Sequence, residues 1–300
     1  MENINWYPGH MKKTRELIEK NLKLVDVVVE VCDARIPISG RNPLIDDIVK
    51  RKPRILLLNK SDLADERRTR MWLSFYGKAF TTLVTNGMSG GGMRELFARL
   101  EVLQREMQEA KASGVARNLR VMIVGIPNSG KSSLLNRLAK RRGAQVGDRP
   151  GVTRGKQWIT IENGMQILDT PGVLWPKFED PRTGMNLAFC GSIRDEILDV
   201  SELGLELIRI LEVQYREPLF ERYGLSEEDL EKAREAGMAM DDYYDEEFVD
   251  SALVIMEAIA KKRGFILPGR KLDYERTART VLDEFRAGMI GRITLELPPK

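Results

Sequence analysis

One eight-residue segment constrains this chain more than any other, because its spacing is typical of a loop that wraps phosphate groups. Residues 125–132 read Gly-Ile-Pro-Asn-Ser-Gly-Lys-Ser, between a strand-like run at 119–124 and a helical pattern at 133–140. The glycines let backbone N–H groups approach the phosphates, and the helix N-terminus adds partial positive charge. The loop residues expected to contact a nucleotide are Asn128, Ser129, Gly130, Lys131, Ser132 and Ser133. We expect Lys131 to act on the β- and γ-phosphates and Ser132 to hold Mg²⁺.

The composition is that of a globular chain with room for two domains. The 300 residues are 42% hydrophobic and 31% charged, which excludes a disordered or collagen-like chain. No run approaches the roughly 18–20 apolar residues of a membrane span, and residues 1–8 contain no signal-peptide core. Because two cysteines are too few for a disulfide framework, we expect a cytoplasmic protein.

The first two thirds of the chain alternates strand-like and helix-like segments. Short runs rich in β-branched residues predict buried strands at 26–33, 54–58, 81–85 and 119–124. A helix is expected at 93–111, and the runs 158–161 and 165–168 predict a hairpin at the sheet edge. The fold class is therefore α/β, with a mostly parallel sheet and helices on both faces.

After residue 178 the apolar residues recur at the three- and four-residue steps of helices. Helices are expected at 187–189, 203–211, 230–239, 248–262 and 277–287. The turn residues Pro176, Pro181 and Gly184 mark the change of pattern. We therefore predict one domain at 1–178, with an N-terminal segment at 1–24, and a small all-helical domain at 179–300.

A second motif for the phosphate side, Asp169-Thr-Pro-Gly172, follows the predicted hairpin. Asp169 is placed to hold Mg²⁺ through water, and the Gly172 N–H to face a γ-phosphate. Between the two phosphate motifs, Thr153 is expected to close over Mg²⁺ when the γ-phosphate is present. The alternative for Thr153 is an ordinary loop threonine.

The segment Asn59-Lys60-Ser61-Asp62 follows a predicted strand and is a candidate base-binding loop. A carboxylate at Asp62 can accept hydrogen bonds from guanine N1–H and the exocyclic amino group, and adenine lacks both donors. Asn59 and the Lys60 stem would pack beside the base, although alone such a segment is as often a solvated turn. Asn86 and Gly87, after the next strand, are expected to place a backbone N–H against guanine O6.

The order of these motifs is a circular permutation of the order in GTPases of the Ras type. There the phosphate loop comes first and the base loops last, whereas here the base loops at 59–62 and 86–87 precede it. Such a permutation is tolerated when the original termini lie close together at the surface. As a consequence, the Asp169–Gly172 motif runs directly into the helical segment.

Five segments carry a further signal together with this order: Trp6-Tyr-Pro-Gly-His-Met11, Asp33-Ala-Arg-Ile-Pro37, Gly147-Asp-Arg-Pro-Gly-Val-Thr153, Asp169-Thr-Pro-Gly-Val-Leu-Trp-Pro176 and Gly291-Arg-Ile293. They resemble the bacterial ribosome biogenesis GTPase A (YlqF) family over essentially the whole chain. The resemblance implies a GTPase that binds a precursor of the large ribosomal subunit, both RNA and proteins, in the GTP state. Subunit binding would stimulate hydrolysis of GTP to GDP and phosphate, and the helical domain would contact ribosomal RNA.

The residue that drives hydrolysis is not where GTPases of the Ras type place it. Val173 stands at the position of their water-orienting glutamine and can neither donate nor accept a hydrogen bond. The resemblance points instead to His10, the one histidine of the chain, which could orient water or could merely pack the N-terminal segment. Asn128 resembles the asparagine of potassium-activated GTPases, which predicts a K⁺ site, or it caps the loop.

The net charge of +3 conceals strong segregation of charge along the chain. Residues 105–156 carry twelve basic and three acidic side chains, and residues 226–250 carry two and eleven. One basic group surrounds the phosphate motifs: Arg137, Lys140, Arg141, Arg142, Arg149, Arg154 and Lys156. A second lies near the C-terminus: Lys261, Lys262, Arg263, Arg270, Lys271, Arg276 and Arg279. Both groups could neutralise RNA phosphates, and the first is better placed for a contact gated by the nucleotide. A solvated surface is the alternative.

Two other functions fit parts of the sequence. Because of Val173, the chain could be a nucleotide-locked module that binds RNA or protein with negligible hydrolysis. An ATP-using enzyme with the same phosphate loop is a third possibility, which Asp62 disfavours. For the ribosome-assembly GTPase that we favour, we expect a monomer without a membrane span and without DNA as a partner.

Overall fold

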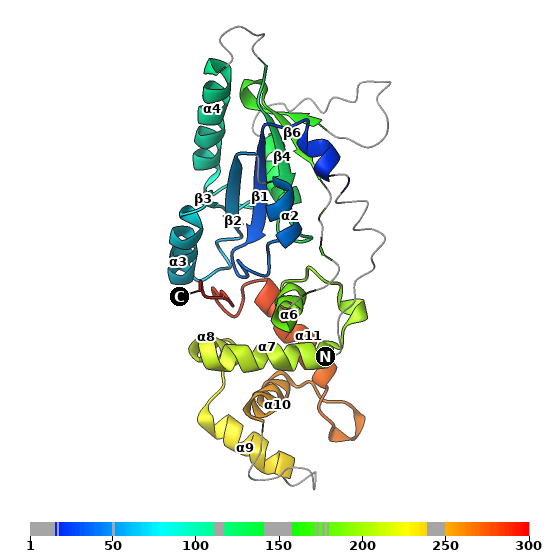
Figure 1. Ribbon diagram of the computed structural model, residues 1–300. Coiled ribbons are helices and arrows are strands. Elements are labelled where there is room, and N and C mark those ends of the chain that lie inside the picture. Colours follow the sequence, from blue (N-terminus) through cyan, green and yellow to red (C-terminus); the bar gives the residue numbers. More distant parts are fainter. Residues whose placement is uncertain are drawn as a thin grey trace. The chain divides into compact units, whose positions relative to one another are not determined.

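The computed structural model (Figure 1) describes most of the chain. The described residues are 16, 18–49, 52–110, 117–140, 158–170, 172, 174–175, 178, 180–238 and 250–299. They fall into two compact units, which we call the sheet unit and the helical unit. The sheet unit comprises residues 1–184 and 296–300, and the helical unit residues 185–295.

The sheet unit is built on a six-stranded sheet with the order β3-β2-β1-β4-β6-β5. Its strands are β1 (Val27–Asp33), β2 (Arg54–Asn59), β3 (Thr81–Val84), β4 (Arg120–Val124), β5 (Trp158–Thr160) and β6 (Gln166–Asp169). Every neighbouring pair is parallel except β5 and β6, which form the antiparallel hairpin expected at the edge. The α/β class and the mostly parallel sheet are therefore confirmed.

Helices cover both faces of this sheet because alternate strand residues point to opposite sides. The helices are α2 (Pro43–Val49), α3 (Glu66–Gly77), α4 (Met93–Glu109) and α5 (Lys131–Lys140). On one face Val29 and Leu57 pack with apolar residues of α4 and α5. On the other face Val28 packs with α2, and Leu58 packs with Trp72 of α3.

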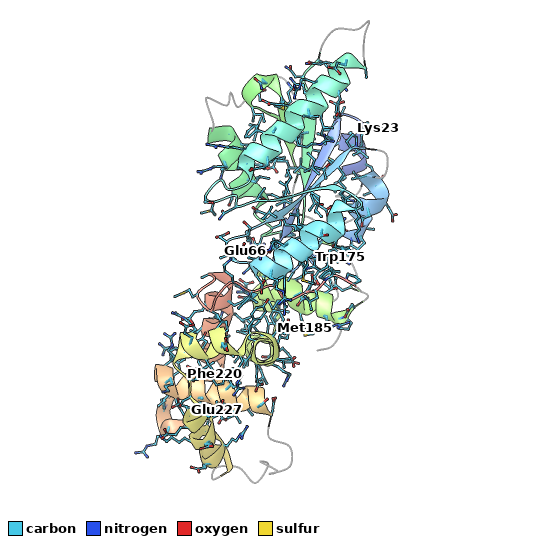
Figure 2. The ribbon with its side chains drawn as sticks, turned by 90° about the vertical axis from the view of Figure 1, so that its left-hand side faces the viewer. Lys23, Glu66, Trp175, Met185, Phe220 and Glu227 are labelled. Atoms are coloured by element: carbon cyan, nitrogen blue, oxygen red, sulfur yellow. The ribbon has the colours of Figure 1, made fainter. Side chains whose placement is uncertain are left out.

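The helical unit begins at Met185, inside helix α6 (Pro181–Phe189). Its further helices are η2 (Asp195–Ile197), α7 (Val200–Gln214), α8 (Arg216–Tyr223), α9 (Glu227–Met238), α10 (Ser251–Arg263), η3 (Pro268–Arg270) and α11 (Tyr274–Arg286). Phe220 of α8, labelled in Figure 2, lies under the Arg216 guanidinium, 4.2 Å from the ring centre. Helices α7 and α11 pack closely because Gly204 has no side chain: a Cβ there would lie 2.6 Å from Ala278 Cα.

The last residues of the chain return to the sheet unit, which the sequence did not predict. The Glu296 carboxylate accepts hydrogen bonds from the Ile38 N–H at 2.5 Å and the Ser39 N–H at 3.1 Å. The Glu296 carbonyl oxygen accepts one from Trp72 Nε1 at 3.0 Å, and the Trp72 side chain is fully buried. Residues 296–300 therefore differ from the expectation that 179–300 form one domain, because long-range hydrogen bonds hold them elsewhere.

No described helix is both long enough and apolar enough to cross a membrane. The two cysteines, Cys32 and Cys190, are both buried, and neither forms a disulfide.

Candidate nucleotide site

The candidate site lies at one edge of the sheet because parallel strands bring their carboxyl ends together. In the strand register Asp33 stands opposite Asn59, and Ile123 opposite Asp169. The segments that begin at these strand ends include the base loop at 59–62 and the phosphate loop at 125–132. The sheet thus brings together motifs that are far apart in the sequence.

Asn59 ties three of these segments together and is almost fully buried. Its Nδ2 donates a hydrogen bond to the Ser129 carbonyl oxygen in the phosphate loop, at 3.0 Å. Its Oδ1 accepts hydrogen bonds from the Gly87 N–H at 2.9 Å and from Thr85 Oγ1 at 3.2 Å. One amide side chain therefore fixes the base loop, the phosphate loop and the 85–87 segment relative to one another.

The phosphate loop has the backbone that its glycines predicted. Gly125 and Gly130 adopt φ angles of +155° and +94°, and Asn128, which is exposed, adopts +57°. A Cβ at Gly130 would collide with Asn59 Nδ2, so only glycine allows the two loops to approach this closely. Helix α5 begins at Lys131, two residues earlier than the sequence pattern indicated.

Lys131 is the buried cation of the phosphate loop. Its Nζ donates a hydrogen bond to the Ile126 carbonyl oxygen at 2.7 Å. Burial lowers the pKa of Lys131 to about 8, and the nearby Asp169 carboxylate offsets part of that effect. Gly172 also lies here, since a Cβ on it would stand 3.0 Å from Lys131 Nζ and 2.8 Å from Pro127 N. The structure therefore places the 169–172 motif against the phosphate loop.

Two exposed oxygen-bearing side chains stand near Lys131 in the fold. Ser132 is exposed in the first turn of α5, and Asp169 is exposed at the end of β6. Hydroxyl and carboxylate oxygens are ligands that suit Mg²⁺, which retains several waters and needs few protein ligands. Among the described residues, no three His, Cys, Asp or Glu side chains gather as a metal-binding cluster. The donors therefore fit a Mg²⁺ shared with a nucleotide rather than an all-protein metal site. Ser133, the next residue of α5, is half-buried.

The base loop presents Asp62 and holds Lys60. Asp62 is exposed, where a base could reach its carboxylate, and Ser61 donates its N–H to the Thr85 carbonyl oxygen at 3.2 Å. Lys60 has a φ angle of +58°, and its Nζ lies 2.9 Å from Asp33 Oδ2. The sequence did not predict this ion pair, although an acidic residue at the end of a neighbouring parallel strand could have signalled it.

The 85–87 segment has a tighter structure than its sequence suggested. Asn86 Oδ1 accepts hydrogen bonds from the N–H groups of Met88 and Ser89, at 2.8 and 2.9 Å. The Gly87 N–H already donates to Asn59, so in this arrangement it supports the base loop rather than standing free for guanine O6. The position of the segment beside the base loop is as expected.

Several predicted residues lie outside the described part of the chain: His10, Thr153, Val173, Arg141, Arg142, Arg149, Arg154 and Lys156. Of the first basic group, Arg137 is described, and its guanidinium donates to the Ser89 carbonyl oxygen. Of the seven residues of the second basic group, Lys262, Arg263 and Arg279 form ion pairs with residues that the structure describes. Lys262 lies 3.0 Å from Asp229, and Arg263 lies 3.2 Å from Glu284.

Comparison with known proteins agrees with this geometry. The profile of the family described as "50S ribosome-binding GTPase" matches residues 120–232. Ribosome biogenesis GTPase A of Bacillus cereus is 43% identical over 298 residues, covering 98% of this chain and 94% of that protein. Two solved structures of YlqF, one GDP-bound and one GNP-bound from T. maritima, each align with a TM-score of 0.63 at 28% identity. They cover 94% and 96% of this chain and 99% of their own. The chain therefore belongs to the ribosome biogenesis GTPase A family and is a GTPase.

Proposed function

We propose that this GTPase assists assembly of the large ribosomal subunit, binding its precursor in the GTP state and hydrolysing GTP when the subunit stimulates it. The observation that carries the proposal is the full-length similarity to proteins named for ribosome biogenesis. We expect it to act in the cytoplasm as a monomer. In this proposal residues 1–178 bind the nucleotide, and residues 179–300 contact ribosomal RNA.

In the nucleotide site, Lys131 would bind the β- and γ-phosphates, and Gly172 would direct its N–H to the γ-phosphate. Ser132, Asp169 and Thr153 are the proposed Mg²⁺ residues. When bound, this ion neutralises negative charge on the phosphates. Asp62 would select guanine by accepting two of its N–H groups, because leaving a carboxylate unpaired against adenine is costly.

For the hydrolysis step we propose His10 as the residue that orients the attacking water. The proposal rests on the family resemblance. Val173 creates the need for such a residue, because its side chain cannot hydrogen-bond at the position next to Gly172. Asn128 is the proposed contact for K⁺. It is exposed on the phosphate loop and adopts a positive φ angle.

An exposed hairpin between α10 and α11 is the proposed RNA contact of the helical unit. Ile266 and Leu272 pair across it, and the Leu267 N–H donates to the Lys271 carbonyl oxygen at 2.7 Å. At its tip Arg270 and Lys271 are exposed and form no ion pair with any residue that the structure describes. Ile266 and Leu267 are 56% and 45% exposed, so cations and apolar side chains are presented together.

The acidic segment supports this choice of surface. Helix α9 presents Glu227, Glu228, Glu231 and Glu235 to solvent, and these carboxylates would repel RNA phosphates. Lys262, next to α9, is already paired with Asp229. The hairpin cations are therefore better RNA contacts than the rest of the second basic group.

Multiple-turnover GTP hydrolysis tests the proposal, measured with and without large subunits in K⁺ and in Na⁺ buffer. We expect subunits to raise the turnover rate and K⁺ to raise it further. Turnover that stays negligible in every condition would instead support the nucleotide-locked binding module, for which Val173 is the argument. Displacement of GTP by equimolar ATP would contradict the role given to Asp62.

A further inference from the structure

One buried ion pair at the nucleotide edge belongs to none of the nucleotide motifs. Asp33, the last residue of β1, and Arg35 are each 1% exposed. Asp33 Oδ1 accepts hydrogen bonds from the Arg35 N–H and from Arg35 Nε, both at 3.0 Å, and Oδ2 accepts one from Arg35 at 2.8 Å. Such a two-point pair fixes the carboxylate in one orientation.

This fixed carboxylate has a second cationic partner, in the base loop. Lys60 Nζ lies 2.9 Å from Asp33 Oδ2, and the Lys60 side chain is 23% exposed. The backbone also joins the two strand ends, because the Ala34 N–H donates to the Asn59 carbonyl oxygen at 2.8 Å. Burial would raise the pKa of Asp33, but Arg35 and Lys60 outweigh it and hold that pKa below its usual value. The carboxylate is therefore charged at neutral pH and holds both cations.

Lys60 needs such an anchor because its backbone is strained. Its φ angle of +58° lies in the left-handed region, which a lysine adopts at a cost and which persists only where neighbours enforce it. The lysine stem lies close to the phosphate loop, since a Cβ on Gly130 would stand 3.9 Å from Lys60 Cε. Because Asp33 holds its ammonium group, the aliphatic stem of Lys60 stays next to the phosphate loop.

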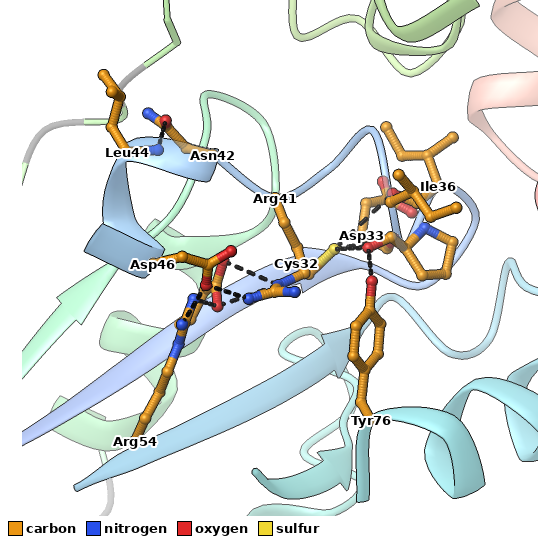
Figure 3. Close-up of polar contacts among 12 residues, drawn as sticks. Cys32, Asp33, Ile36, Arg41, Asn42, Leu44, Asp46, Arg54 and Tyr76 are labelled. Carbon is orange, nitrogen blue, oxygen red and sulfur yellow. Dashed lines mark hydrogen bonds and ion pairs between the residues drawn. The ribbon is translucent and has the colours of Figure 1, made fainter. Parts of the chain in front are cut away.

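Hydrogen bonds hold the turn that carries Asp33 and Arg35, and Figure 3 shows the contacts around Asp33, Ile36 and Tyr76. The Tyr76 hydroxyl donates to the Pro37 carbonyl oxygen at 2.9 Å, and the Ile36 N–H donates to the Asp33 carbonyl oxygen at 3.1 Å. A Cβ at Gly40 would lie 2.6 Å from the Ile36 carbonyl oxygen, so this turn also requires a glycine. A turn held by these contacts allows Asp33, a residue outside the base loop, to set the position of Lys60.

We propose that Asp33 is a positioning residue for guanine nucleotides: it acts through Lys60, fixing the stem against which the base packs. The inference rests on the proposed role of residues 59–62 as the base loop. Since GDP and GTP share the base, the loss of Asp33 should lower the affinity for both nucleotides by the same factor. It should leave kcat at saturating GTP unchanged, as well as the preference for guanine over xanthine.

Fluorescent methylanthraniloyl nucleotides and the full-length chain provide the test. Asp33→Asn and Lys60→Met should each raise Kd for GDP and for GTP roughly tenfold, the loss expected for a hydrogen bond to a charged group. The double variant should be no weaker than either single variant, because both remove the same interaction. Asp26→Asn is the matched control: its carboxylate accepts the Arg120 N–H at 3.0 Å just before the start of the same strand. It should leave both Kd values within about twofold.

Three results would overturn the proposal. They are an unchanged Kd for Asp33→Asn, losses that multiply in the double variant, and losses matched by Asp26→Asn. If Asp33→Asn does not fold, Lys60→Arg against Lys60→Met decides, because arginine keeps a cation for Asp33. Equal losses for these two variants would also contradict the proposal. Asp62→Asn checks the base loop separately: if it does not shift preference from GDP to xanthosine diphosphate, the assignment of the base loop fails, whatever Asp33 does.

Discussion

At the carboxyl edge of the sheet, polar side chains are buried and bonded to the backbone of several loops, whereas in the helical unit many pair with one another on the surface. Asn59 and Asp33 are each 1% exposed and Lys131 is 8% exposed. In the helical unit, Arg279 and Glu275 form an ion pair while 50% and 69% exposed. The difference teaches that the sheet unit has a preformed site for one small ligand. The helical unit instead carries many of its charges as solvated ion pairs on its surface.

Asn59→Ala should have the largest effect, because it removes the side chain that connects three loops at the edge of the sheet. It leaves the Gly87 N–H and the Ser129 carbonyl oxygen without their buried partner, which should lower the free energy of unfolding by about 2–4 kcal/mol. GDP affinity should fall as well, because three segments lose their common tie. Urea unfolding and GDP titration measure the two losses.

The matched control for this variant is Asn136→Ala, since Asn136 is an exposed asparagine on α5. It should stay within about 0.5 kcal/mol of the unchanged chain. Equal losses for Asn59 and Asn136 would show that the edge of the sheet is not the organised network described above.

The pKa of Lys131 predicts how nucleotide affinity changes with pH. Without nucleotide the pKa is lowered to about 8, whereas phosphate oxygens would keep the ammonium charged and raise that pKa. Below pH 8 the lysine is already charged, so GDP affinity should be nearly flat. Above pH 8 binding must take up a proton, so affinity should fall by about tenfold per pH unit.

Titration of GDP at pH 7, 8 and 9 and constant ionic strength checks this prediction. Lys131→Arg should bind more weakly but without the fall above pH 8, because arginine stays charged. A flat profile to pH 9 in the unchanged chain would mean that Lys131 is not desolvated as the structure indicates.

How much of this site the sequence predicts depends on whether the signal is local. The phosphate loop and the strands were predictable because glycines and β-branched runs act over a few residues. Helix α8 was not predicted, and α2 and α3 were expected only as helical stretches between the strands, without bounds. Most of α3 is polar, with Trp72 and Tyr76 carrying its buried face, and α8 contains Pro218. Only tertiary packing stabilises such segments as helices.

Contacts between distant residues could not be predicted in the same way. Glu296 meets Trp72 and Ser39 across more than two hundred residues of sequence, and nothing near Glu296 signals it. The Asp33–Lys60 pair was closer to prediction, since Asp33 ends β1 and Lys60 directly follows the neighbouring strand β2. The sequence of the base loop at 59–62 does not indicate that Asp33 is buried and forms an ion pair with Arg35.

Charge reversal at the hairpin, Arg270→Glu with Lys271→Glu, should weaken binding to large subunits and leave GDP affinity unchanged. In a plot of log affinity against log salt concentration, the magnitude of the slope should fall by about two, roughly one for each lost phosphate contact. Reversing two paired cations instead, Lys232→Glu with Arg279→Glu, changes net charge equally. A similar loss from both variants would indicate general charge attraction rather than a hairpin contact.

The smallest effect is expected at an exposed ion pair of the helical unit. Glu275→Gln should change the free energy of unfolding by less than about 0.5 kcal/mol, because both partners of the pair remain solvated. Urea unfolding is the measurement. A loss as large as that from Asn59→Ala would remove the contrast between the two units.

The central claim is that the strand-end loops form one guanine-nucleotide site whose hydrolysis the subunit controls. Its most direct test is Asp62→Asn assayed with GTP and with xanthosine triphosphate, each with and without large subunits. The variant should lose GTP turnover and gain xanthosine triphosphate turnover that large subunits stimulate, because the amide restores the hydrogen bonds only to xanthine. If the variant still hydrolyses GTP at the rate of the unchanged chain, and xanthosine triphosphate gains nothing, the claim is contradicted.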